Sequence, residues 1–126
     1  MSGESYRLDF ILPVLPAMNT AATRAHRMVQ YREAKALQQV VGHVAKLRPH
    51  RPLARARVTA VRCSARQPDF ENMVYSFKPI FDALVNIGVL AGDGPAVCDR
   101  VYRWEPAPAR KGHVRITVQE LKGEQS

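Results

Sequence analysis

The sequence predicts an α+β fold, a single domain with a mixed β-sheet and two main helices in the order β-α-β-α-β-β. Segments with alternating apolar residues are interspersed with two segments whose apolar spacing is helical. The chain has 126 residues, 46% of them hydrophobic, which is enough for one core. No repeat or linker divides it. We therefore expect one domain over residues 1–126, with residues 122–126 as a frayed tail.

The first half of the chain predicts a strand, a long helix and a second strand. Residues 5–12 alternate, with Leu8 and Phe10 on one face and Arg7 and Asp9 on the other. Residues 27–47 carry valines and leucines at helical spacing, and "RPHRP" ends that helix. Residues 53–65, rich in Val, Ala and Thr, predict the second strand.

An apolar stripe from Phe77 to Ile87 predicts a second helix that stops at Gly88. Ser76 is the expected N-cap, which would put Pro79 in the first turn, where proline is tolerated. The alternative is a preliminary turn from Asn72 with a kink.

The chain then predicts a Gly- and Pro-rich loop over residues 88–97 and two strands, over residues 97–104 and 112–121. The segment between these strands, "EPAPARKG", is long for a hairpin loop.

Charge is unevenly distributed along the chain. There are 19 Lys and Arg residues against 11 Asp and Glu, a net charge of +8. Residues 69–99 hold five acids and one lysine, so this window is net −4 and the rest of the chain is net +12. A cationic body favours a polyanionic partner, most often nucleic acid, and an acidic island within it is typical of a metal-dependent nuclease.

The acids Asp69, Glu71 and Asp93, together with Lys78, form the constellation that could carry chemistry. Asp69 and Glu71 are expected in the loop before the second helix, where residues two apart in extended backbone project to the same side. Asp93 follows that helix, and its loop must double back to bring the three carboxylates together. Converging carboxylates would suit Mg²⁺. The alternative is that these acids are ordinary turn and cap residues.

Other chemistries find no support in the sequence. There is no phosphate-binding GxxxxGK[ST], GxGxxG, HExxH or GxSxG motif. The two cysteines fit no zinc spacing, and no apolar run approaches the ~20 residues of a membrane span. The N-terminus lacks the pattern of a secretory signal, so a cytoplasmic location is expected and no membrane partner.

The stretch "PDFENMVYSFKPIFDALVNIGVLAGDG" resembles the signature of the RusA-like Holliday junction resolvases. That signature consists of Asp-x-Asp-Asn, a Lys, Asp-Ala-Leu, a short gap with a Gly, and Asp-Asp. "ILPVLPAMN" is similar to the family's Leu-Pro-x-x-Pro strand end. The resemblance spans about residues 5–121 and is dense between residues 68 and 93.

The resemblance implies a homodimeric, Mg²⁺-dependent endodeoxyribonuclease, with Mn²⁺ as a possible substitute. Such an enzyme resolves four-way (Holliday) DNA junctions by paired symmetric nicks in recombination and repair. It implies a bacterial or phage-encoded, nucleoid-associated protein of the cytoplasm. The catalytic and metal-binding acids fall on Asp69, Glu71 and Asp93, the signature lysine on Lys78 with a catalytic role, and the signature amide on Asn72 with a DNA-binding role. Asp-Ala-Leu falls on residues 82–84.

The chain departs from the signature at three places. Glu71 stands where the family usually has Asp, Lys78 lies three residues further from Asn72, and Gly92-Asp93 replaces the paired aspartates. Asp82 is expected to have a structural role, pairing with Lys78 or orienting it.

Six cations in expected loops or helix ends are candidates for contacts with the DNA backbone, which position the duplex arms without reading sequence. They are Arg24, Arg27, Arg48, Arg51, Arg110 and Lys111.

Three readings remain open at this point. The first is an active junction resolvase. The second is a catalytically weakened or inactive protein that binds junctions on the same fold. The third is an unrelated basic α+β module, for example one that binds RNA, whose acids are only caps and turns.

Overall fold

The computed structural model describes residues 5–13 and 27–121, without the side chains of residues 27–34 and 36. Its elements are β1 (Arg7–Leu12), α2 (Arg27–Ala45), β2 (Ala56–Ser64), α3 (Phe70–Asn86), β3 (Cys98–Pro106) and β4 (His113–Glu120). The expected fold class, α+β with the order β-α-β-α-β-β, is confirmed. The expected frayed tail lies outside the described residues.

The four strands form one mixed sheet in the order β1-β4-β2-β3. β2 and β3 are parallel, and β4 is antiparallel to both β1 and β2. The last two strands therefore lie on either side of β2, and the segment between them crosses the end of that strand. This crossing explains why "EPAPARKG" is longer than a hairpin needs.

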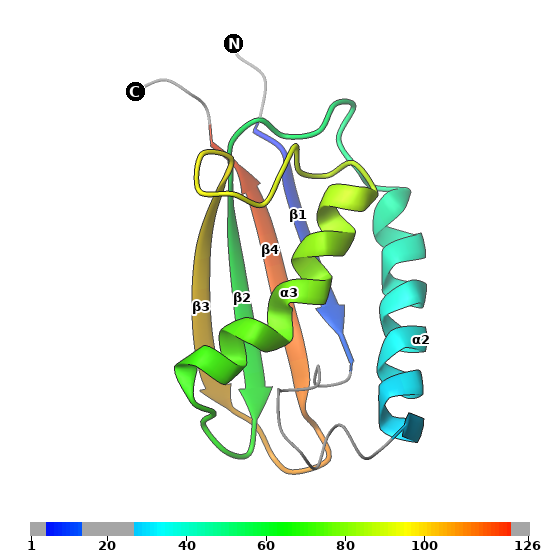
Figure 1. Cartoon of the computed structure of the whole chain (residues 1–126), viewed down its shortest axis with the longest axis vertical. Helices are drawn as coiled ribbons and strands as arrows, with labels where there is room; N and C mark the ends of the chain where they lie inside the picture. Colours follow the sequence, from blue (N-terminus) through cyan, green and yellow to red (C-terminus); the bar gives the residue numbers. More distant parts are fainter. Residues whose placement is uncertain (1–4, 14–26, 122–126) are drawn as a thin grey trace.

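Both helices lie on the same face of the sheet, with α3 running diagonally across it and α2 beside the β1 edge (Figure 1). α3 connects the parallel pair β2 and β3, which requires a crossover of this kind. The core lies between the sheet and the helices. Its fully buried side chains include Phe77, Ile80 and Leu84 of α3 and Val58 and Ile116 of the sheet.

The second helix begins earlier than the sequence analysis expected. α3 starts at Phe70 with Asp69 at the N-cap position, and the proposed cap, Ser76, is buried inside the helix. The Ser76 hydroxyl donates a 2.6 Å hydrogen bond to the carbonyl of Met73. Met73 is itself buried, so the apolar stripe continues one turn upstream of Phe77 and extends the helix.

Pro79 lies inside α3 and not in its first turn. Proline has no N–H to give to the carbonyl four residues earlier. Because Pro79 is on the exposed side of α3, water can hydrogen-bond the freed carbonyl there. The expected stop is confirmed, since α3 ends at Asn86 and Gly88 follows with φ +90°, a conformation that glycine adopts without strain.

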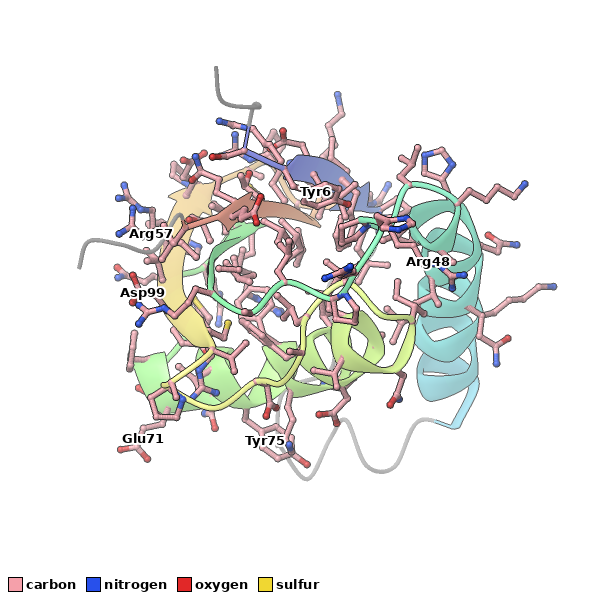
Figure 2. All side chains as sticks on the ribbon, turned by 90° about the horizontal axis from the view of Figure 1, so that it is seen from above. Tyr6, Arg48, Arg57, Glu71, Tyr75 and Asp99 are labelled. Carbon is pink, nitrogen blue, oxygen red and sulfur yellow. The ribbon has the colours of Figure 1, made fainter. Side chains whose placement is uncertain are left out.

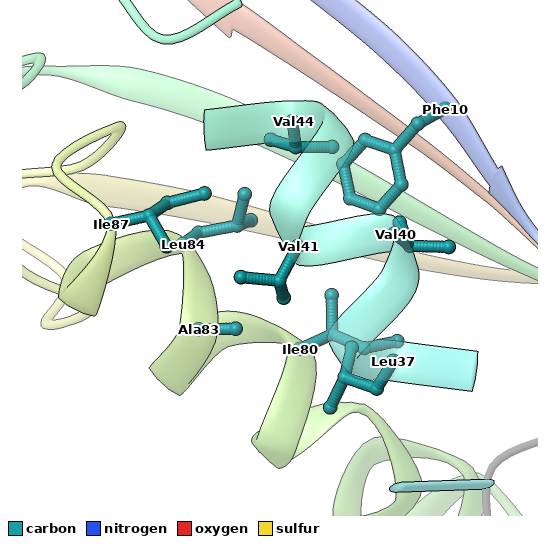
Figure 3. Close-up of a pocket in the computed structure, with 9 residues that line it drawn as sticks. All are labelled: Phe10, Leu37, Val40, Val41, Val44, Ile80, Ala83, Leu84 and Ile87. Atoms are coloured by element: carbon teal, nitrogen blue, oxygen red, sulfur yellow. The ribbon is translucent and has the colours of Figure 1, made fainter. Parts of the chain in front are cut away.

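The helices do not fill the space between them. Apolar side chains of α2 and α3, with Phe10 of β1, line a gap of about 10 Å³ (Figure 3). This is about the least space that admits one water molecule, and the apolar lining leaves a water there no partner. Within the described residues, no helix is long and apolar enough to cross a membrane.

Candidate functional site

Asp69 stands at the point where the chain enters α3. Its backbone is not helical, with φ −55° and ψ 140°, while its carbonyl accepts the N–H of Met73 at 2.9 Å. The Asp69 carboxylate makes no capping hydrogen bond, although Asp is among the preferred capping residues. The carboxylate is exposed and is not used to close the helix end.

Glu71 and Asn72 lie in the first turn of α3, not in an extended loop as expected. Glu71 points away from the sheet together with Tyr75 (Figure 2). In helical backbone, residues two apart project to different sides, so the rule for extended chain does not bring Asp69 and Glu71 together. Both acids nevertheless lie at the positive end of the α3 dipole, which favours negative charge.

Asp93 lies in the loop between α3 and β3. Two features fix this loop: a bridge between Leu53 and Leu90 ties it to the segment before β2, and the N–H groups of Val97 and Cys98 both donate to the carbonyl of Gly94. The negative charge of Asp93 contributes to raising the pKa of the Cys98 thiol, although burial is the larger cause. The charge of Asp93 therefore affects the pKa of Cys98, the first residue of β3.

The carboxylates of Asp69, Glu71 and Asp93 differ from the other acids in one respect. Among the side chains that the structure describes, these three carboxylates form no hydrogen bond and no ion pair. Every other described acid is engaged with a partner: Asp9 with Arg7, Asp82 with Lys78, Asp99 with Arg57, Glu105 with Arg115 and Glu120 with the N–H of Tyr6. Although the chain has a net charge of +8, these three acids, among those with described side chains, have no cationic partner and are free to bind a ligand.

An open groove separates the start of α3 from the Asp93 loop. Its volume is about 500 Å³, and its lining includes Phe70 and Val74 of α3, Pro95 of the loop, and Cys98 and Tyr102 of β3. The ring centroids of Phe70 and Tyr102 are 6.0 Å apart. From Tyr102 back to Cys98 the strand spans roughly 13 Å. None of the three predicted acids lines the groove: Asp69 and Glu71 are the chain neighbours of Phe70, and Asp93 lies two residues before Pro95.

The donor set suits Mg²⁺ in its chemistry, because all three acids offer oxygen ligands with no other partner. Its arrangement is not that of a ready three-ligand site. No group of three or more His, Cys, Asp or Glu residues within residues 5–13 and 27–121 is placed to hold a metal ion. Mg²⁺ is often held by one or two carboxylates plus phosphates of the substrate, which keeps the three-acid site a prediction.

Lys78 lies on the same exposed side of α3 as Glu71, seven residues and roughly 10 Å further along the axis. Its Nζ is 3.4 Å from the carboxylate of Asp82, in an exposed i,i+4 pair. The pairing expected for Asp82 is thus present. Exposed pairs of this kind are weak, so the ammonium of Lys78 remains free to exchange partners. Its catalytic role stays a prediction.

The candidate DNA-contacting cations fall at two ends of the sheet. Arg48 and Arg51 precede the start of β2, whereas Arg110 and Lys111 follow the end of β3, and β2 and β3 are parallel. Arg110 and Lys111 are therefore at the end where α3 begins. Arg48 also has a structural contact, since its guanidinium donates to the carbonyl of Ile87 at 3.5 Å.

The remaining candidates cannot be placed by their side chains. Arg24 lies outside the described residues, and Arg27 opens α2 without a described side chain. The segment "VLPAMN", which is part of the resemblance, also lies outside the described residues.

The aromatic side chains of the groove are not among the residues predicted from the sequence. Phe70 is 63% exposed, and the ring of Tyr102 stacks on that of Phe77 with centroids 5.8 Å apart. The signal was present in "PDFEN", where a large apolar side chain stands between two acids. With the helix start placed at Ser76, Phe70 counted only as a loop residue.

No protein-family model and no curated protein matches this chain. The likeness to the RusA-like resolvases therefore rests on the residues quoted for it.

Proposed function

We propose that this protein is a Mg²⁺-dependent, structure-specific endodeoxyribonuclease that cuts four-way DNA junctions. It would act as a homodimer in the bacterial cytoplasm and would be encoded by a bacterial or a phage gene. The observation that carries the proposal is the contrast among its carboxylates. Asp69, Glu71 and Asp93, the acids that the resemblance selects, are those without a partner among the described side chains. Unpaired acids on a cationic protein repel phosphate unless a cation lies between them.

The proposal assigns a task to each of these residues. Asp69 and Glu71 would hold Mg²⁺ at the start of α3, and Asp93, in the loop between α3 and β3, would be the third ligand. A bound Mg²⁺ lowers the pKa of water and polarises the phosphate. Asn72, half-buried in the first turn of α3, can donate its amide N–H groups to a phosphate oxygen.

The cations would contact the phosphates of the DNA backbone. Arg110 and Lys111 lie at the end of the sheet where α3 begins, so a duplex arm that contacts them passes the start of α3. Arg51 lies at the other end and would hold a second arm. A junction has two-fold symmetry, so two such sites on a homodimer make paired nicks.

A second candidate is a protein that binds junctions without cutting them. The observation that favours it is the lack of a ready three-carboxylate group in the described chain. Glu71 and Gly92, where the family has aspartates, point in the same direction. This candidate shares the cationic contacts and differs only in turnover.

One experiment separates the two candidates from a general basic protein. A labelled mobile four-way junction and a linear duplex of equal length are incubated with the protein in MgCl₂ or in EDTA. The nuclease predicts symmetric nicks in the junction with MgCl₂ alone. The binder predicts a retarded junction and no product in either buffer. Equal affinity for junction and duplex, without product, would reject both.

A further inference from the structure

The groove between α3 and β3 has the features of a nucleotide-binding surface. β3 is the edge strand of the sheet, so its outer edge pairs with no other strand of the described sheet (Figure 1). Its lining includes the ring of Tyr102 and the apolar side chains of Val74 and Pro95. A volume of about 500 Å³ lies within the range of small-ligand sites, and the groove is shallow and open.

Phe70 contributes an exposed aromatic ring to the lining of the groove. Its ring meets that of Tyr102 edge to face, at 88°. Tyr102 is itself held by Phe77, at 5.8 Å, and by Phe81, at 6.1 Å between centroids. Phe70 is thus the exposed end of an aromatic cluster anchored in the core. A phenylalanine that is 63% exposed and contacts the core only through Tyr102 offers its free surface to a flat partner.

Cationic side chains accompany this aromatic ring in the lining of the groove. Arg55 and Arg100 line the groove, and Arg100 lies 5.8 Å over the ring of Phe81. The acid on the groove, Asp99, is neutralised by Arg57 at 3.0 Å. Arg55 forms no ion pair within the described part of the chain. The residues that line the groove therefore combine an aromatic surface with a net positive charge, as surfaces that bind single-stranded nucleic acid do.

We propose that this groove holds an unpaired nucleotide of the DNA strand, with its base stacked on Phe70 and its phosphates beside Arg55 and Arg100. The proposal deepens the proposed function and rests on it for the identity of the strand. A branch point is where unpaired bases become available, and Phe70 directly follows Asp69. A base held on Phe70 would place the neighbouring phosphate at the start of α3.

The test uses single-stranded DNA without metal, so that it does not depend on cleavage. Binding of a fluorescein-labelled oligo(dT) is measured by anisotropy in EDTA for the wild type and for Phe70→Ala. Loss of one stacked base predicts affinity weaker by about tenfold or more. The matched control is Tyr75→Ala, an exposed aromatic of the same helix that points away from the sheet, and it should bind within about twofold of the wild type.

Two further variants distinguish stacking from a structural effect. Phe70→Trp should keep the affinity, and its added fluorescence should be quenched when oligo(dT) binds. Arg55→Gln should reduce the salt dependence of binding by about 0.7 in the log–log slope, as expected for one phosphate contact to a single strand.

Three outcomes would overturn the proposal. The first is that Phe70→Ala and Tyr75→Ala weaken the binding of oligo(dT) equally. The second is that the fluorescence of Phe70→Trp does not change when oligo(dT) saturates the protein. The third is that Phe70→Ala weakens the binding of a polyglutamate peptide, which has charge but no bases, as much as that of oligo(dT). The junction-cleavage assay reports the proposed function separately. A protein that binds oligo(dT) through Phe70 and cuts no junction would keep the groove and reject the nuclease.

Discussion

The indole N–H of Trp104 donates a 2.9 Å hydrogen bond to the hydroxyl of Ser64, joining β3 to the last residue of β2. Ser64 in turn donates to the carbonyl of Arg66 at 2.7 Å, and its own carbonyl accepts the N–H of Ala107 at 3.0 Å. Three hydrogen bonds thus fix the point from which the chain leaves the sheet toward Asp69. Asp69 follows this anchor by five residues.

The first prediction concerns the anchor. Trp104→Phe keeps an aromatic ring but removes the N–H, so Ser64 loses its donor. We expect a loss of about 1 kcal/mol in the free energy of unfolding, typical of one hydrogen bond. Urea denaturation followed by circular dichroism measures it. A Trp104→Phe protein as stable as the wild type would show that the hydrogen bond does not contribute.

The second prediction concerns Arg110, the one described non-glycine residue with positive φ, at 73°. The N–H of Lys111 donates to the carbonyl of Pro108, which places Arg110 at the third position of a turn, where glycine is favoured. An arginine there costs about 1 kcal/mol or more of backbone strain. We expect Arg110→Gly to weaken junction binding without lowering the melting temperature.

The salt dependence of that binding gives the matched measurement. Loss of one phosphate contact should reduce the log–log slope of affinity against salt by about 1. Arg48→Gln is the contrasting variant, because Arg48 also donates to Ile87 at the end of α3 and should lower stability. If Arg110→Gly binds the junction as the wild type does at every salt concentration, a contact between Arg110 and a DNA phosphate is ruled out.

The third prediction follows from the buried thiol of Cys98. Burial, the largest cause, and the charges of Asp93 and Asp99 raise its pKa to about 11, against the opposing effect of Arg100. The folded state thus disfavours the thiolate, while the unfolded chain ionises near the ordinary value of about 9. This contribution to stability is complete below pH 9 and is lost as the pH rises to about 11.

Urea titrations between pH 8 and 11 check the sign. The wild type should lose stability across this range more steeply than Cys98→Ala, which cannot ionise there. Tyrosines titrate in both proteins and cancel in the comparison. Parallel curves for the two proteins would contradict the assigned pKa.

The fourth prediction concerns the gap between α2 and α3 (Figure 3). Val41 lines it, and Val41→Ile adds one methylene without changing the branching of the side chain. Filling the gap should stabilise the protein by up to about 0.8 kcal/mol, the value of one buried CH₂. A rise in melting temperature measures the effect. A lower melting temperature would mean that the helices already pack too tightly there.

The order of the elements could be predicted because each segment carries its own periodicity. The start of α3 could not be predicted. Pro79 and Ser76 are local signals of a helix entry, whereas the burial of Met73, which extends the helix upstream, is a tertiary contact that the local sequence does not reveal. The unused carboxylate of Asp69 could be predicted as a candidate, but not its freedom from partners. The groove could not be found at all, since Phe70 and Tyr102 are 32 residues apart in the chain.

The central claim is that Asp69 is used for cleavage, and one measurement tests it most directly. Single-turnover rates of junction cleavage in MgCl₂ are compared for the wild type, Asp69→Asn and Asp9→Asn. Asp9 is the matched control, because it is an exposed aspartate of β1 that pairs with Arg7 and has no part in the proposed site. Even groups that only orient a metal ligand change activity by about 10–100-fold, so we expect Asp69→Asn to lose about 100-fold or more, with Asp9→Asn close to the wild type. Equal rates for Asp69→Asn and the wild type, or no cleavage by the wild type, would contradict the account.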